Sequence, residues 1–294
     1  MTEMKQQILG LIREYVKSGR ELDEDYISRL FHILVSCQRL EKYFKIEDFL
    51  YDNTLSSTAQ YFIKEKTLKI NRNLLSLELE DYIKALAADG IETAYLPFTY
   101  LAEILVHESE HAAQIRELDN PNDSVRNRIL QTTYKGSEFE FLTLEKLSTL
   151  SREEVFLYLA KKKAFTERDE VYGSYHSYAP EERLANVQAF DVVADVIRGL
   201  NYLDGGKLSQ FDYDYRYWAL DDLLEPYKEP EDLNPTGMYF DLMKLEGPDL
   251  SMEAVKSLSF KERFELGLPI TPQEFERLEG VKDCLDKRIS LYKK

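Results

Sequence analysis

Several residue types are scarce in this chain, and each scarcity narrows what the protein can be. The 294 residues contain two cysteines, Cys37 and Cys284, which lie far apart and outside any metal-ligand spacing. Cys37 sits among apolar neighbours, so we expect a buried thiol. No stretch approaches the ~20 apolar residues of a membrane-spanning helix, and residues 1–11 lack the apolar core of a signal peptide. We therefore expect a cytoplasmic protein that does not bind membranes.

Basic residues are also in short supply. The chain has 38 lysines and arginines against 54 aspartates and glutamates, a formal net charge of −16. Such a surface repels phosphate backbones and anionic lipids, so we expect no nucleic-acid partner. An acidic mimic of DNA would need carboxylates arranged at phosphate spacing, and a solvated acidic surface is the simpler interpretation.

The spacing of apolar residues predicts a mostly helical α+β fold. Helical periodicity is found near residues 8–19, 27–37, 74–88, 98–118 and 180–200, and from residue 272 onward. Two short alternating runs, 59–64 and 67–71, flank Glu65-Lys66 and predict a β-hairpin. Residues 91–96 have the pattern of a further strand that ends at Pro97.

Glycines mark the best candidate for a domain boundary. Asp204-Gly205-Gly206 interrupts the helical pattern, so we divide the chain into a core, 1–203, and a helical C-terminal extension, 204–294. Within the extension, Tyr213, Tyr215 and Tyr217 alternate. Their spacing suits one face of a strand or a partner-binding patch, but packing in a core or crevice is the favoured interpretation. Capping-box patterns at 151–154 and 271–274 predict two helix starts.

Histidine occurs four times, and two of the four lie one helical turn apart. His107, Glu108 and His111 form the pattern His-Glu-x-x-His within the predicted helix 98–118. Residues four apart share a helix face, so both imidazoles can reach one metal ion. Glu108 is rotated by about 100° from His107, which places its carboxylate beside the open coordination position. There it can take a proton from a water whose pKa a zinc ion lowers to about 7.

A zinc site of this type needs a third protein ligand. The candidates include His176, His32 and several acids, of which Glu182 is preferred. Glu182 heads a helical face that continues through small and apolar residues, namely Ala185, Ala189, Val193 and Val196. A carboxylate at the head of a buried stripe needs a partner, and a metal ion can be that partner. Glu181 heads a mixed face and is the second choice, and the simpler interpretation of both is the enrichment of acids in the first turn of a helix.

The two motifs together resemble those of a known family. His107-Glu108-Ser109-Glu110-His111, followed by Glu182-Arg183-Leu184-Ala185-Asn186, is similar to the zincin metallopeptidases with a glutamate third ligand, the gluzincin type, and to the small ImmA/IrrE-like enzymes. The likeness covers roughly residues 55–200 and implies an active-site helix packed beside a small sheet, with extra helices at both ends. It implies one zinc ion held by His107, His111 and Glu182, with Glu108 as the general base. Glu110 and the 70-residue gap before Glu182 depart from the family pattern.

The favoured hypothesis is a zinc-dependent peptidase acting on a peptide or protein substrate. Water attacks the peptide carbonyl, and Glu108 takes the proton and relays it to the leaving amine. Tyr175, His176 and Tyr178 precede the helix of Glu182, and among them His176 and Tyr178 are the expected donors to the oxyanion. A solvated loop histidine is an equally good interpretation of His176. The alternative is a catalytically inactive zincin-like module that binds partners through its acidic, tyrosine-rich C-terminal part.

Overall fold

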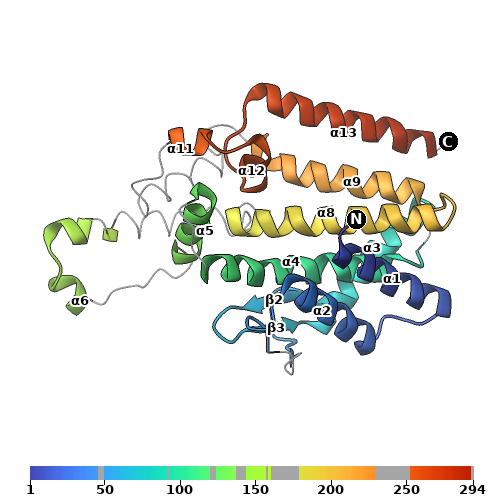
Figure 1. The fold of residues 1–294 in the computed structure, drawn as a ribbon, viewed down its shortest axis with the longest axis horizontal. Coiled ribbons are helices and arrows are strands. Elements are labelled where there is room, and N and C mark those ends of the chain that lie inside the picture. Colours follow the sequence, from blue (N-terminus) through green and yellow to red (C-terminus); the bar gives the residue numbers. More distant parts are fainter. Residues whose placement is uncertain are drawn as a thin grey trace. The chain divides into compact units, whose positions relative to one another are not determined.

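The computed structural model describes residues 1–45, 50–91, 93–119, 124–136, 144–156, 158–159, 179–228 and 252–292. Helices dominate and a small three-stranded sheet accompanies them, so the predicted mostly helical α+β class is confirmed (Figure 1). The elements are α1 (Glu3–Ser18), α2 (Glu24–Gln38), β1 (Leu50–Tyr51), β2 (Ala59–Phe62), β3 (Thr67–Ile70), α3 (Arg72–Ala88), α4 (Leu96–Asp119), α5 (Val125–Gly136), α6 (Leu144–Ser148), α8 (Pro180–Leu203), α9 (Ser209–Leu224), the 3₁₀ turn η2 (Glu225–Tyr227), α11 (Met252–Lys256), α12 (Phe260–Glu265) and α13 (Pro272–Tyr292). Within the described ranges, none of the helices combines the length and the apolar composition that crossing a bilayer requires.

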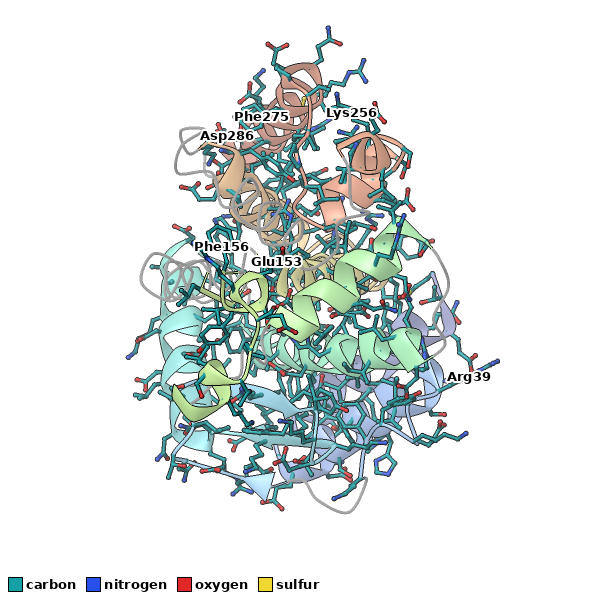
Figure 2. All side chains as sticks on the ribbon, turned by 90° about the vertical axis from the view of Figure 1, so that its left-hand side faces the viewer. Arg39, Glu153, Phe156, Lys256, Phe275 and Asp286 are labelled. Atoms are coloured by element: carbon teal, nitrogen blue, oxygen red, sulfur yellow. The ribbon has the colours of Figure 1, made fainter. Side chains whose placement is uncertain are left out.

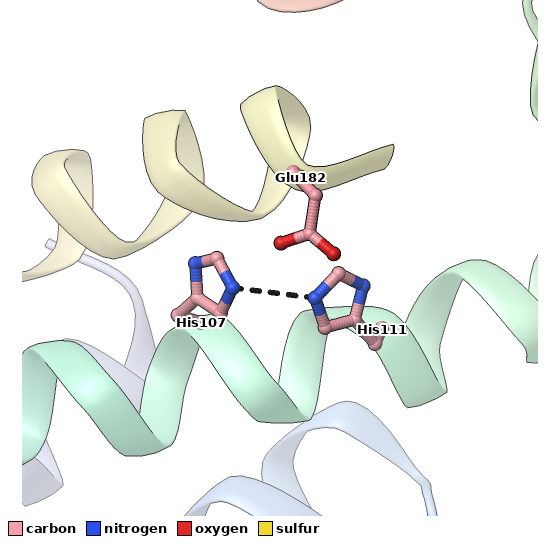
Figure 3. A group of neighbouring side chains, drawn as sticks. All are labelled: His107, His111 and Glu182. Atoms are coloured by element: carbon pink, nitrogen blue, oxygen red, sulfur yellow. Dashed lines mark hydrogen bonds between the residues drawn. The ribbon is translucent and has the colours of Figure 1, made fainter. Parts of the chain in front are cut away.

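The chain packs into two compact units. The first comprises residues 1–116, 185–223 and 277–294, and the second comprises residues 117–184 and 224–276. In the first unit, one continuous core collects apolar side chains from α1, α2, the sheet, α3, α4, α8 and α9. Within it α4 and α8 run side by side (Figures 1 and 3).

The N-terminal helices form as their periodicity predicts. α1 buries Ile8, Leu11, Ile12 and Tyr15 on one face. It ends at Gly19, whose φ of 64° lies in the left-handed region that glycine adopts without strain. α2 ends in the same conformation at Arg39, whose side chain points outward (Figure 2).

The small sheet has the order β1-β3-β2. β2 and β3 are antiparallel, with Tyr61 opposite Leu68, so the predicted hairpin is confirmed. β1 pairs with β3 in parallel, which leaves β2 at one edge of the sheet. Asn71 then accepts hydrogen bonds from the N–H groups of Asn73 and Leu74 and caps α3.

The second unit has its own smaller core, built from Ile129, Leu130, Leu184, Val255, Leu266 and Leu268. Arg183 is fully buried beside it, and its Nε donates to the carbonyl of Phe264 at 2.8 Å. Its guanidinium carbon lies 4.8 Å from the ring centre of Phe264. The ring of Phe264 therefore stabilises the buried guanidinium of Arg183 through a cation–π contact.

Both predicted capping boxes form. The N–H of Ser151 donates to Glu154 at 2.7 Å, and the N–H of Thr271 donates to Glu274 at 2.8 Å. In each box the glutamate N–H donates back to the hydroxyl of the first residue. Local hydrogen bonding therefore fixes where these two helical segments begin.

Two local predictions are wrong, and for the three tyrosines only the less favoured strand alternative is excluded. Residues 91 and 93–96 contain no strand: Leu96 begins α4, and Pro97 lies in its first turn, where a missing N–H costs nothing. Tyr213, Tyr215 and Tyr217 lie on α9 and not on a strand, because that whole segment is helical, and Tyr215 is buried as core packing requires. Cys37 is half-buried where a buried thiol was expected, and partial burial raises the pKa of its thiol.

Candidate metal centre

α4 places His107 and His111 one helical turn apart on the same face. Their Nε2 atoms are 3.2 Å apart, and their rings are inclined at 80° to each other. His111 is buried and His107 is half-buried. Two imidazole nitrogens therefore converge on one small volume beside the helix (Figure 3).

Glu182 joins this pair from the first turn of α8. Its carboxylate points toward the two imidazoles (Figure 3), and one ligand atom from each of the three residues lies within 4.8 Å of the other two. The stripe that follows Glu182 on α8, namely Ala185, Ala189, Val193 and Val196, is buried throughout. Small residues such as Ala185 and Ala189 permit the close approach of a neighbouring helix.

The donor set fits a zinc ion. Two ligands bound at about 2.0–2.1 Å in a tetrahedral arrangement are separated by about 3.4 Å, close to the observed separation of the imidazole nitrogens. Two imidazoles and a carboxylate are also ligand types that zinc accepts, and three protein ligands leave one position open.

Glu108 is turned away from the His107–His111 face and is held by the sheet. Its Oε2 accepts a hydrogen bond from the backbone N–H of Tyr61 on β2 at 2.6 Å. The side chain is buried, and Oε1 accepts no hydrogen bond from any residue that the structure describes. One oxygen is thus anchored while the other remains available to a reactant.

A cavity of about 210 Å³ adjoins the imidazole of His107. Its walls come from the sheet region, α4 and α8, and the residues that line it are Thr58, Ala59, Glu103, Ile104, His107, Glu108, Asn186 and Ala189. A ligand in this cavity would contact the predicted base and one of the predicted metal ligands at once.

Glu103 brings a second carboxyl group to this cavity from one turn before His107. Its Oε2 accepts a hydrogen bond from the hydroxyl of Tyr215 at 2.9 Å. Burial is the largest influence on Glu103 and raises the pKa of its carboxyl to about 7, against the opposing effects of Tyr215 and His107. Burial also raises the pKa of Tyr215 well above 10, and the nearby Glu103 charge adds to that shift.

The other residues singled out in the sequence have different surroundings. His176 and Tyr178, like Tyr175, lie outside the described residues. Glu181 is buried but does not belong to the group formed by the two histidines and Glu182. His32 is exposed on α2, and its Nδ1 lies 2.7 Å from the carbonyl oxygen of Ser28.

Three polar residues of the cavity, Thr58, Glu103 and Asn186, were given no role from the sequence. Glu103 is an acid on an otherwise apolar stretch of α4, four positions before His107, and that shared helical face was the available signal. Asn186 lies four positions after Glu182 on α8, within the same five-residue motif. The anchoring of Glu108 by a backbone N–H has no sequence signal, because any residue at position 61 would supply the donor.

Comparison of the chain with protein-family models, with curated proteins and with solved structures finds no match. The chemistry of the site therefore follows from its motif and its geometry alone. These provide three ligands suited to a divalent cation, an anchored carboxylate beside them and a small cavity into which the carboxylate and His107 both face.

Proposed function

We propose that this protein is a zinc-dependent metallohydrolase that cleaves peptide or protein substrates. The observation that carries the proposal is the convergence of the Nε2 atoms of His107 and His111, 3.2 Å apart, with the carboxylate of Glu182. The resemblance of the His-Glu-x-x-His and Glu-x-x-Ala-Asn motifs to those of gluzincin peptidases supports it.

His107, His111 and Glu182 are the residues that would hold the ion. When bound, zinc supplies a Lewis acid that polarises a carbonyl and lowers the pKa of a water. Glu108 Oε1 accepts the proton of the attacking water as the carbon–oxygen bond forms. The same carboxyl then donates this proton to the leaving amine as the carbon–nitrogen bond breaks. The hydrogen bond from Tyr61 to Oε2 holds the carboxylate in place during both transfers.

The surroundings of the site suit an extended peptide. β2 is an edge strand of the described sheet, and Ala59 on it lines the cavity. An extended substrate chain can add to a sheet edge through main-chain hydrogen bonds, with its side chains entering adjacent pockets. His176 and Tyr178 remain the predicted donors to the oxyanion.

The test is peptide hydrolysis by zinc-loaded protein and two matched variants. Glu108→Gln keeps the shape of the side chain but cannot accept the proton, so we expect kcat to fall by at least about 100-fold with zinc content unchanged. Glu110→Gln, two residues along the same helix, removes the same charge and should retain most of the activity.

Hydrolysis that is equal in the wild type and Glu108→Gln would contradict the proposed role of Glu108. If zinc binds but a diverse peptide mixture is left intact by the wild type, the catalytically inactive interaction module becomes the better description. Glu108→Gln would then spare both metal binding and partner binding.

A further inference from the structure

The cavity beside His107 is acidic and small. The described residues that line it include two carboxyl groups, Glu103 and Glu108, and no lysine or arginine. At about 210 Å³ it lies below the ~300–1,000 Å³ typical of pockets for whole drug-sized ligands. It therefore suits a single side chain or a chain end of a peptide.

The two carboxyl groups are held differently. Glu108 is fixed by the Tyr61 N–H and belongs to the proposed hydrolytic machinery. Glu103 accepts one hydrogen bond, from the hydroxyl of Tyr215 to Oε2, and its Oε1 accepts none from the described residues. No lysine or arginine of the described chain forms an ion pair with Glu103.

The electrostatic surroundings of Glu103 are unfavourable for an isolated carboxylate. Burial and the negative charge of Asp222 disfavour its ionised form, while Tyr215 and His107 only partly offset them. Glu103 in turn raises the pKa of Tyr82, for which burial is the larger cause. A cation from outside the chain would offset the cost of burying this charge.

We propose that Glu103 is a specificity residue that binds a cationic group of the substrate, an alkylammonium or guanidinium, in the cavity beside the metal centre. Residues 103 and 107 are separated by four positions, about 6 Å along the axis of α4. The cation would therefore belong to a substrate residue at or next to the cleaved bond. This inference rests on the proposed function for the identity of the substrate as a peptide.

The inference is tested by measuring kcat/KM for pairs of peptides that differ only in whether one side chain carries a positive charge. Lysine is compared with norleucine, and arginine with citrulline, at each position around the cleaved bond. We expect wild-type kcat/KM to favour the cationic member by about 10–100-fold, the effect of one charge-assisted hydrogen bond. Glu103→Gln should bring this ratio to about one, whereas Glu80→Gln, on the exposed face of α3, should leave the ratio as it is.

Acetylation of the substrate N-terminus separates the two sources of the cation. If the preference follows the lysine or arginine side chain and survives acetylation, the cavity binds a side chain. If every pair gives a ratio near one but acetylation lowers kcat/KM by about 10–100-fold in the wild type and not in Glu103→Gln, the cavity binds the α-ammonium group. Both results support a cation site at Glu103, and a ratio near one in the wild type for every pair together with no effect of acetylation overturns it.

A binding measurement that needs no turnover keeps this inference separate from the proposed function. Binding of n-butylammonium and of neutral n-butanol to the full chain is followed by NMR in wild type, Glu103→Gln and Glu80→Gln. Binding of n-butylammonium that is lost only in Glu103→Gln supports the inference even if no peptide is cleaved. Equal binding in all three proteins, or none, overturns it even if peptides are cleaved, and melting curves confirm that Glu103→Gln is folded.

Discussion

His107 and His111 point the same way because residues four apart lie on one face of α4. Glu182 reaches them from the first turn of α8, while its neighbour Glu181 is buried elsewhere. The rotation of about 100° between successive helical residues separates the two glutamates, so that only one of them can face the imidazoles.

Replacing each of these two glutamates in turn tests the third ligand. Glu182→Gln should weaken zinc binding by at least about 100-fold, because an amide oxygen is a much poorer zinc ligand than a carboxylate. Glu181→Gln should change the affinity by less than about threefold. Competition titration with a zinc-binding dye measures both, and the reverse order of effects would assign the ligand to Glu181.

The raised pKa of Glu103 implies that the free energy of unfolding of the metal-free protein depends on pH. Its carboxyl has a pKa of about 7 in the folded chain, above its ordinary value of 4.5, so the folded state binds the proton more tightly than the unfolded state. Its contribution to the free energy of unfolding therefore decreases as pH rises from about 4.5 to 7, by about 1–3 kcal/mol. Urea unfolding in the presence of EDTA at several pH values measures this change in the free energy of unfolding.

Glu103→Gln should remove this part of the pH dependence, so that the variant gains stability relative to wild type between pH 5 and pH 8. Glu80→Gln provides the control, because Glu80 is exposed and paired with Lys84. Parallel pH curves for wild type and Glu103→Gln would contradict the assignment.

The sequence was sufficient for those parts of the site that lie within one helix. A four-residue spacing predicts that His107 and His111 converge, and the position of Glu108 follows from the same helix. Glu103 shares the helical face of His107 and was overlooked, whereas the Tyr61 N–H could not be recognised, because its role depends on which strand packs against α4. That tertiary information is not contained in local spacing.

At the scale of elements, one buried lysine ties α1 to α8. The Nζ of Lys5 lies 2.6 Å from Asp191 and 2.8 Å from Asp195, both on α8. Burial lowers the pKa of Lys5, but the two carboxylates outweigh burial and raise it above 10.5. The lysine is therefore charged at neutral pH and links two helices far apart in the sequence.

Lys5→Met should lower the free energy of unfolding by about 1–2 kcal/mol, since methionine fills the space but leaves Asp195 with only the more exposed Arg198 as a partner. Lys17→Met, at the exposed end of the same helix, should change it by less than about 0.5 kcal/mol. Chemical denaturation of the two variants measures the difference. Equal stabilities would mean that apolar packing alone holds α1 against α8.

Element boundaries were predictable where a local signal marks them. Gly19, Asn71 and Thr271 each provide a cap or a stop, and the helices begin or end at these residues. Residues 91–96 were mistaken for a strand because Ile91, Tyr95 and Leu96 are apolar and close together. Ile91, Tyr95 and Leu96 are nevertheless buried in the core, where Tyr95 lies in a turn and Leu96 begins α4.

At the scale of the whole molecule, a net charge of −16 disfavours the long-range attraction of anions and favours that of cations. The proposed zinc ion and the cationic substrate group both agree with this balance. A protein so acidic gains stability when a divalent cation binds the folded state, because binding to the native state alone shifts the unfolding equilibrium.

Zinc content tests the central claim most directly. Wild-type protein purified without added zinc is compared with His107→Ala by elemental analysis, with circular dichroism to show that both are folded. We predict about one zinc ion per chain in the wild type and less than about a tenth of that in His107→Ala. Equal zinc contents in the two folded proteins, whether high or close to zero, would contradict a metal centre at His107, His111 and Glu182.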